Sequence, residues 1–381
     1  MSVTVIMPYF KINSGIPFLW LKQFIQVIGW LALLPLSHAE TIPEYQNQHQ
    51  RQRPVIAVLA DNRMTELSDF VIPYGVLKQA KIADVKAVAP NKGLIQFFPA
   101  LQAYAELSFE EFANDFPAGA DYVIVPALHY DDDPVILHWL RQQAEHGATL
   151  VAICDGAWVL ANAGLLQGKQ ATSFWYAQRK LRSRFADTQW QADRRYLADH
   201  KVMTTAGVSA ALPASIALVA AIAGKPVAEQ LGSYYAQTDW SSRHDSTQFE
   251  FQWRDYWQIA VNWLSFWRHQ QRLVNIYTGI DEVALALQAD AYSRTYRDQV
   301  ISYNASENHV SSQNGLVFLI EQNQQKPRQK FLPALQHQSA IGALNQALQE
   351  IQTEQGAASC RLVQLLLEYP KPCESPPLSP S

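Results

Sequence analysis

Cys154 follows a short apolar run and precedes a helical pattern, in the segment Leu150-Val-Ala-Ile-Cys-Asp-Gly-Ala157. Leu150–Ile153 has the character of a buried strand, and the small residues Gly156 and Ala157 permit the close backbone approach of a sharp turn. Such a turn places the thiol at the start of the next helix, where exposure and the helix dipole favour a thiolate. The pattern predicts a nucleophile elbow with cysteine as the nucleophile. The alternative is a buried core cysteine at a strand end.

The chain has two other cysteines, Cys360 and Cys373. They are close in sequence and could form a disulfide in an oxidising compartment, which would leave Cys154 free. All three could equally stay reduced, and Cys360 lies in a helical pattern with Leu362 and Leu365 that is typical of a core position.

Composition bounds the class of protein. The chain has 381 residues, of which 48% are hydrophobic and 17% charged, as in a soluble globular protein long enough for two domains. The net charge of -4 gives no general attraction to nucleic acid. No paired metal-ligand motif or Gly-rich phosphate loop is present, so we expect no metal and no cofactor. Tryptophans cluster between Trp240 and Trp267, which predicts buried aromatic packing or a covered interface.

Residues 1–39 resemble an export signal. Phe24–Leu36 is apolar, and Ser37-His38-Ala39 offers small residues for cleavage before Glu40, which predicts a periplasmic or otherwise exported protein. The alternative is an uncleaved membrane anchor over residues 16–36, although Lys22 interrupts it. Residues 40–52 are polar and Gln-rich like a linker, and residues 370–381 form a Pro/Ser-rich tail that we expect to be disordered.

Strands alternate with helices over residues 53–232, which indicates an α/β fold with a mostly parallel sheet covered on both faces. We expect strands at 54–60, 84–90, 121–126, 150–153 and 201–207, and helices at 66–78, 109–114, 134–146, from 156, and 211–223. Ligands of such sheets bind at the carboxyl ends of the strands. The segment before Glu66, the loop after Pro126 and the elbow at Cys154 should meet there.

Three segments carry a resemblance to a known family: Cys154–Trp175 (CDGAWVLANAGLLQGKQATSFW), Thr204–Ala210 (TTAGVSA) and Glu66–Leu77 (ELSDFVIPYGVL). Through these three segments, residues 53–232 resemble the DJ-1/PfpI family of the class I glutamine amidotransferase-like superfamily. The similarity is greatest to the amidotransferase-like domain that precedes the DNA-binding half of some AraC-type regulators. The resemblance implies a flavodoxin-like sandwich and a homodimer. No basic helix-turn-helix is visible, so we expect no nucleic-acid partner.

The resemblance also implies roles for site residues: Cys154 as nucleophile and Glu66 as the acid that hydrogen-bonds the thiol. Two positions that often hold histidine in relatives are Phe174 and Asp155 here. His129 could replace the missing base.

Asp131 or Asp132 would orient His129, although the acidic run, through Asp133, also suits the N-cap of the next helix. His244 is a second candidate base or a surface residue.

The remaining residues form two predicted regions. Residues 233–271 are a Trp-rich connecting segment, and residues 272–369 repeat the order strand, glutamate at a helix start, strand. Glu282 falls there where Glu66 does, so this smaller α/β region resembles a degenerate second copy without an elbow.

Two classes of function follow. One is a cysteine-dependent hydrolase, amidase or hydratase-like enzyme on a small amide, carbonyl or isonitrile substrate. The other is a non-catalytic member that binds a small molecule or senses oxidants through Cys154.

Overall fold

The computed structural model describes residues 42–370 and residue 373. The described residues form one compact unit. The predicted signal or anchor and most of the predicted tail lie outside the described residues. None of the helices described is long and apolar enough to cross a membrane.

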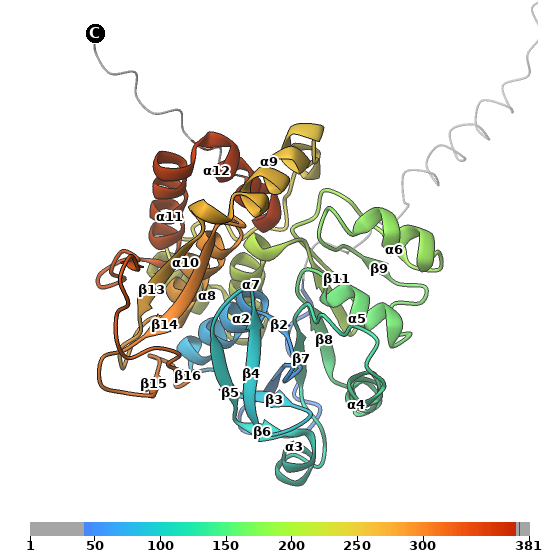
Figure 1. Cartoon of the computed structure of the whole chain (residues 1–381). Coiled ribbons are helices and arrows are strands. Elements are labelled where there is room, and N and C mark those ends of the chain that lie inside the picture. The colour runs from blue at the N-terminus through green and yellow to red at the C-terminus, as the bar shows by residue number, and fades with distance from the viewer. Residues whose placement is uncertain (1–41, 371–372, 374–381) are drawn as a thin grey trace, which may run out of the picture. The chain divides into compact units, whose positions relative to one another are not determined.

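A seven-stranded sheet forms the centre of the fold (Figure 1). Neighbouring strands are parallel except for the antiparallel pair β11–β12. In spatial order the strands are β11 (Tyr196–Asp199), β12 (Val202–Thr205), β8 (Thr149–Ala152), β7 (Tyr122–Val125), β1 (Val55–Leu59), β3 (Asp84–Ala89) and β6 (Leu107–Ser108). The flavodoxin-like, mostly parallel α/β fold predicted from the sequence is confirmed.

Strand β1 is buried on both faces, and its side chains divide between two cores because successive residues of a strand point to opposite sides. Ile56 and Val58 join the core that includes α2 (Leu67–Ala80) and α7 (Ala211–Ala223). Val55, Ala57 and Leu59 join the core that includes α3 (Phe109–Asp115), α4 (Pro134–Glu145) and α5 (Gly156–Asn162). Helices therefore cover both faces of the sheet.

The C-terminal region has a smaller parallel sheet in which β13 (Gln270–Asn275) lies between β14 (Asp298–Tyr303) and β17 (Lys330–Phe331). Helix α10 (Glu282–Ser293) packs against β14, α11 (Ala340–Gln355) packs against α10, and α12 (Ala357–Leu367) packs against α11. Helix α10 lies directly against α2, where a Cβ at Gly75 would be 2.7 Å from Val283 Cγ2. The extra α/β region is thus joined to the first region through a close helix–helix contact.

A second, five-stranded sheet crosses between the two regions, and it was not predicted. Its strands, in order, are β15 (His309–Ser311), β16 (Val317–Leu319), β5 (Gln102–Ala105), β4 (Gly93–Phe98) and β2 (Thr65–Glu66). Strand β16 pairs with β5 antiparallel, with Ala103 opposite Phe318. The remaining elements are β9 (Gln170–Ala171), β10 (Gln189–Trp190), α6 (Gln178–Arg184), α8 (Lys225–Tyr234) and α9 (Trp253–Leu264).

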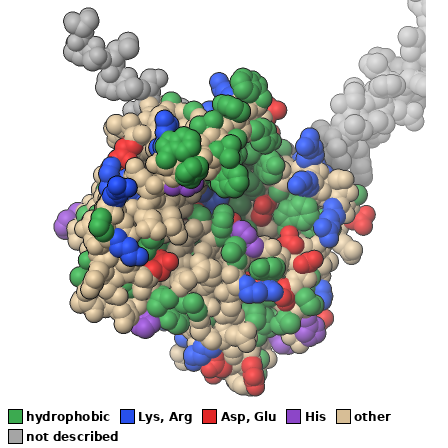
Figure 2. All heavy atoms as spheres, viewed as in Figure 1, with side chains coloured by type: hydrophobic (Ala, Val, Ile, Leu, Met, Phe, Trp, Pro, Cys, Tyr) green, Lys and Arg blue, Asp and Glu red, His purple; other side chains and the backbone are tan. Residues whose placement is uncertain are grey.

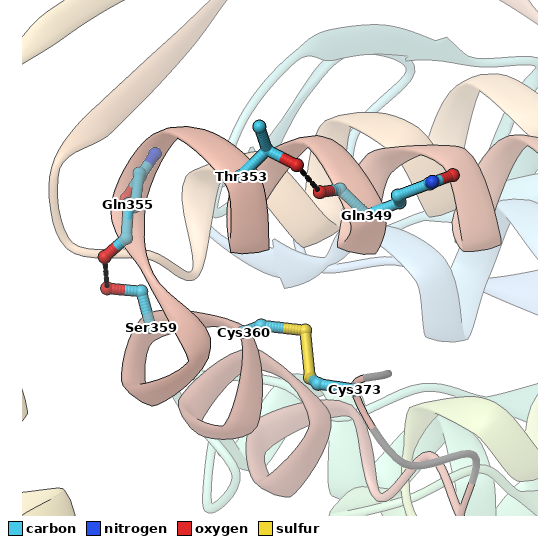
Figure 3. Close-up of a disulfide and its surroundings, with 6 residues drawn as sticks. All are labelled: Gln349, Thr353, Gln355, Ser359, Cys360 and Cys373. Carbon is cyan, nitrogen blue, oxygen red and sulfur yellow. Dashed lines mark hydrogen bonds between the residues drawn. A yellow bond between two sulfur atoms is a disulfide. The ribbon is translucent and has the colours of Figure 1, made fainter. Parts of the chain in front are cut away.

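Cys360 and Cys373 form a disulfide, and Cys154 is a free cysteine. Figure 3 shows the bond joining the first part of α12 to residue 373. Cys360 is also a buried core residue of α12, so the disulfide and the helical core position that were considered for it are both found.

The Trp-rich segment differs from the expectation of buried packing. Trp253, Trp257, Trp263 and Trp267 are 65–80% exposed in the described structure.

Candidate active site

The chain turns at Cys154, between β8 and α5, with a left-handed backbone (φ 55°). This conformation costs a non-glycine residue about 1 kcal/mol. The Cys154 N–H donates to Thr205 Oγ1 at 3.0 Å, and Ser173 Oγ donates to the Cys154 carbonyl at 3.3 Å. A Cβ at Gly156 would lie 2.1 Å from the Val125 carbonyl oxygen, so only glycine fits there. These contacts hold the predicted strand–turn–helix elbow in place.

The thiol of Cys154 is buried, with 7% of the residue exposed. Burial raises the pKa of the Cys154 thiol well above its usual range, and the carboxyl groups of Asp69, Asp155 and Glu66 raise it further. The expectation that exposure and the helix dipole favour a thiolate is therefore wrong. Helix α5 is only seven residues long, and its dipole is outweighed by burial and three acidic neighbours. The resting thiol is protonated at neutral pH.

Glu66 stands at the end of β2 and at the N-cap of α2. Its Oε2 accepts a hydrogen bond from Arg294 Nη2 at 2.6 Å, and its Oε1 lies 3.3 Å from His129 Nε2. Burial opposes ionisation, but the Arg294 charge and the His129 hydrogen bond outweigh it and lower the pKa of Glu66. The Glu66 carboxylate thus faces Arg294 and His129, in place of the hydrogen bond to the thiol that the resemblance implied.

Asp69, one turn later on α2, is an acid that the sequence analysis missed. Its Oδ2 accepts the Ala127 N–H at 3.2 Å, while its buried Oδ1 has no hydrogen-bond partner among the described residues. Burial, and next the charge of Glu66, raise the pKa of Asp69 well above its usual range. Burial therefore favours the neutral form of Asp69, and its ionised form would raise the pKa of Cys154 more than that of Asp155 or Glu66. Its spacing of three residues from Glu66, on the same face of a helix, was the available signal.

Arg294, which follows α10 in the C-terminal region, is the second residue that was missed. Its Nε donates to Asp290 Oδ1 at 2.5 Å while its Nη2 binds Glu66. Burial disfavours the charge, yet Asp290 and Glu66 raise the pKa of Arg294 above its usual value. The C-terminal region thus supplies the counter-charge that keeps Glu66 ionised.

His129 lies in the loop after β7, as predicted, and the structure brings it to Glu66. Its side chain is 34% exposed and its ring lies 4.7 Å from the ring of Phe98. The predicted orienting residues are wrong in detail, because Asp131 accepts hydrogen bonds from Asn162, and Glu66 is the acid that contacts the imidazole.

Asp133 caps α4 through the Val135 and Ile136 N–H groups, which confirms the capping alternative for that residue.

Asp155 occupies the position after the nucleophile where some relatives have histidine. Burial, and next the charge of Glu66, raise the pKa of the Asp155 carboxyl to about 7. The hydrogen bond that Ser173 Oγ donates to Asp155 Oδ1 at 3.4 Å acts in the opposite direction and lowers this pKa. A group that titrates near neutral pH can both accept and donate a proton under working conditions. The Asp155 carboxyl also acts electrostatically on the Cys154 thiol.

His244 is buried rather than on the surface, and it pairs with Glu368. Its Nε2 lies 2.7 Å from Glu368 Oε1, and the two side chains are 6% and 1% exposed. The other oxygen of Glu368 accepts the N–H groups of Gly207 at 2.6 Å and Trp175 at 3.3 Å. Glu368 also acts electrostatically on Asp155, so this second pair borders the site from the side of α12.

Within residues 42–370 and 373, no group of three or more His, Cys, Asp or Glu side chains is arranged to hold a metal ion.

A family model described as "DJ-1/PfpI family" matches residues 54–221. Isonitrile hydratase from Pseudomonas putida is 30% identical over 176 residues, which cover 44% of this chain and 73% of the relative. This chain belongs to the DJ-1/PfpI family. The DJ-1/PfpI region thus includes Glu66, Asp69, His129, Cys154 and Asp155, whereas Arg294, His244 and Glu368 come from outside it.

A second relative of this DJ-1/PfpI chain is the HTH-type transcriptional regulator CdhR from Pseudomonas aeruginosa. It is 30% identical over 102 residues, or 27% of this chain, and the chain spans only 30% of the regulator's length.

Solved structures of family members are similar over about half of the chain. DJ-1beta from Drosophila melanogaster is 21% identical and matches 48% of this chain and 96% of its own, with a TM-score of 0.43. A THiJ/PfpI family protein from Pseudomonas syringae is 22% identical and matches 51% of this chain and 81% of its own, also with a TM-score of 0.43.

Proposed function

We propose that this protein is an exported enzyme that uses Cys154 to hydrate or hydrolyse a small substrate of the isonitrile or amide class. The observation that carries the proposal is the setting of the thiol. Cys154 is held in a left-handed elbow, and two acids whose own pKa values are raised by burial, Asp69 and Asp155, act on its thiol. Similarity to an isonitrile hydratase supports the substrate class.

The raised thiol pKa makes proton removal part of the reaction. For an isonitrile, Asp155 takes the thiol proton as the sulfur bonds to the terminal carbon, and the proton is then delivered to that carbon to give a thioimidate. Water adds to the same carbon, with one proton going to the substrate nitrogen. The carbon–sulfur bond then breaks, the sulfur regains a proton, and an N-substituted formamide leaves. The sum is one isonitrile and one water to one formamide.

Asp69 and His129 have separate places in this scheme. Asp69 is assigned to stabilise the sulfur when it carries negative charge, because its buried carboxyl acts on the thiol and burial favours its protonated form, which can donate a hydrogen bond. His129 is partly exposed and is held by Glu66, which suits it to orient the incoming water.

Export is the second part of the proposal. Residues 24–39 have the apolar run and small residues of a signal peptide, and the Cys360–Cys373 disulfide is typical of an oxidising compartment. N-terminal sequencing of the protein from its host should find a mature chain that begins near Glu40. A chain that begins at Met1 in the membrane fraction would show an anchor instead.

A non-catalytic role in small-molecule binding is the competing function. It is favoured by the protonated thiol and by the absence of histidine at both usual positions. Similarity to a transcriptional regulator is consistent with it. Oxidant sensing is less well supported, because sensor cysteines react as accessible thiolates of low pKa.

A substrate panel decides between these functions. Wild type, Cys154→Ser and Asp155→Asn are incubated with aliphatic isonitriles and amides, and the products are quantified by mass spectrometry. The enzyme proposal predicts turnover by wild type and a loss of at least about a hundredfold in both variants. Turnover that persists in Cys154→Ser would contradict it, whereas saturable binding without turnover by any form would favour the binding role.

A further inference from the structure

Helix α9 is packed with its polar side facing the protein. Asp255 binds Arg361 of α12 at 3.2 Å. Asn262 Nδ2 donates to the Thr295 carbonyl at 2.8 Å and to Ser359 Oγ at 3.2 Å. Asp255 and Asn262 are the buried residues of this helix. A surface helix of a soluble protein normally turns its apolar stripe inward, and α9 does the reverse.

The opposite side of α9 is strongly apolar and exposed. Together with the short helical turn that follows, it forms an aromatic patch of large side chains that are 51–80% exposed: Trp253, Tyr256, Trp257, Trp263, Leu264, Phe266 and Trp267. Figure 2 shows hydrophobic side chains gathered at the top of the molecule, over α9. Contiguous exposed apolar surface of this kind marks an interaction site.

The residue types in the aromatic patch favour one kind of partner. Tryptophan and tyrosine concentrate at membrane–water interfaces, where the ring is apolar and its N–H or O–H stays hydrated. Arg254 near the start of α9 and Arg268 in the helical turn after it are exposed, and in the described part of the chain neither guanidinium group has a hydrogen bond or ion pair. Free cations at both ends of an apolar face match a surface of anionic lipid headgroups.

The geometry points to a role for α9 as an interfacial anchor: we propose that the aromatic patch docks on the surface of an anionic bilayer with the helix in the membrane plane. With 12 residues, α9 is too short to span a bilayer, so the helix lies on the membrane rather than across it.

The test uses the full chain and a readout that is specific to α9. Hydroxyl-radical footprinting with mass spectrometry measures the modification rates of Trp257 and Trp263 with and without phosphatidylglycerol vesicles. The proposal predicts a fall of at least about threefold on vesicles, while Tyr130, exposed elsewhere, keeps its rate. This readout is independent of any membrane binding by residues 1–39.

Variants then test whether the aromatic patch and its two arginines are responsible for binding to vesicles. Trp257→Gln/Trp263→Gln should weaken binding to vesicles at least about tenfold, and Arg254→Gln/Arg268→Gln should remove the preference for phosphatidylglycerol over phosphatidylcholine. The matched control is Leu94→Gln/Val135→Gln, which replaces two exposed apolar residues outside the patch and should bind as wild type.

Two outcomes would overturn the proposal. One is an unchanged footprint at α9 on vesicles. The other is protection that appears without lipid and increases with protein concentration, which would make the patch an interface with a second copy of the chain; sedimentation velocity would then show the dimer.

Discussion

Arg294 Nη2 lies 2.6 Å from Glu66 Oε2, although 228 positions separate the two residues in the chain. The same guanidinium binds the buried Asp290, so it balances two carboxylates at once. Arg294→Met should lower the free energy of unfolding by roughly 3–5 kcal/mol, because it leaves buried charges without a partner. Urea denaturation at pH 7 measures this. Arg268→Met, at an exposed position, should change stability by less than about 0.5 kcal/mol, and an equal effect of both would contradict the structural role.

Asp155 makes stability depend on pH. Its pKa of about 7 in the folded state is higher than in an unfolded chain, so the folded protein holds this proton more tightly. Its contribution is present at low pH and is lost as the pH rises from about 4 to 7. Asp155→Asn should therefore be more stable than wild type at pH 8 by roughly 2–4 kcal/mol, with little difference at pH 4. Denaturation curves at both pH values test this, and a constant difference between variant and wild type would show that the folded carboxyl is not perturbed.

The thiol should respond differently to its two nearest acids on α2. Glu66 is ionised and raises the pKa of Cys154, so Glu66→Gln should speed alkylation by iodoacetamide about three- to tenfold at pH 8. Asp69→Asn should change the rate less than about twofold at that pH, because burial favours the neutral form of Asp69. Adduct mapping by mass spectrometry gives both rates. Equal responses would mean that the protonation states are assigned wrongly.

The variant His129→Ala separates a role of His129 in turnover from a role in the stability of the fold. Turnover should fall at least about a hundredfold, the usual contribution of a positioned acid or base. The free energy of unfolding should change by less than about 1 kcal/mol, because the side chain is 34% exposed. Steady-state kinetics and denaturation report the two quantities separately, and a large loss of stability with normal turnover would make His129 a structural residue.

The disulfide fixes which cysteine reacts. In non-reducing conditions Cys154 should be the one thiol that is modified, and slowly, because Cys360 and Cys373 are bonded. Replacing both by alanine should cost roughly 2–4 kcal/mol of stability, as expected for a short closed loop. Thiol counting in denaturant with and without a reductant checks the first expectation. Three free thiols in the unreduced protein would contradict the bond.

Much of the first region could be predicted because its signals are local. Apolar runs gave the parallel strands, and helical spacing gave α2 even with Pro73 inside it. The expected meeting of the loops at one sheet edge is found for Glu66, which contacts His129 and acts electrostatically on Cys154.

What could not be predicted depends on contacts between distant segments. Arg294 and Glu368 reach the site only because α10 packs on α2 and α12 ends beside Gly207. The protonation states of Asp69 and Cys154 were missed for the same reason, as burial depends on the completed tertiary structure. The position of Cys154 at the start of α5 could be recognised from the sequence, whereas its burial and the effect of Asp69 could not.

The sheet that joins β5 to β16 has a consequence for how the chain folds. Ala103 pairs with Phe318 across more than half of the sequence, so the edge formed by β4 and β5 stays incomplete until the C-terminal region is present. Chains rich in such long-range pairings fold slowly, because a large loop must close before the contacts form. On the export proposal, a chain that completes this sheet late would still be unfolded when it reaches a translocation pore, which is the state that such a pore can thread.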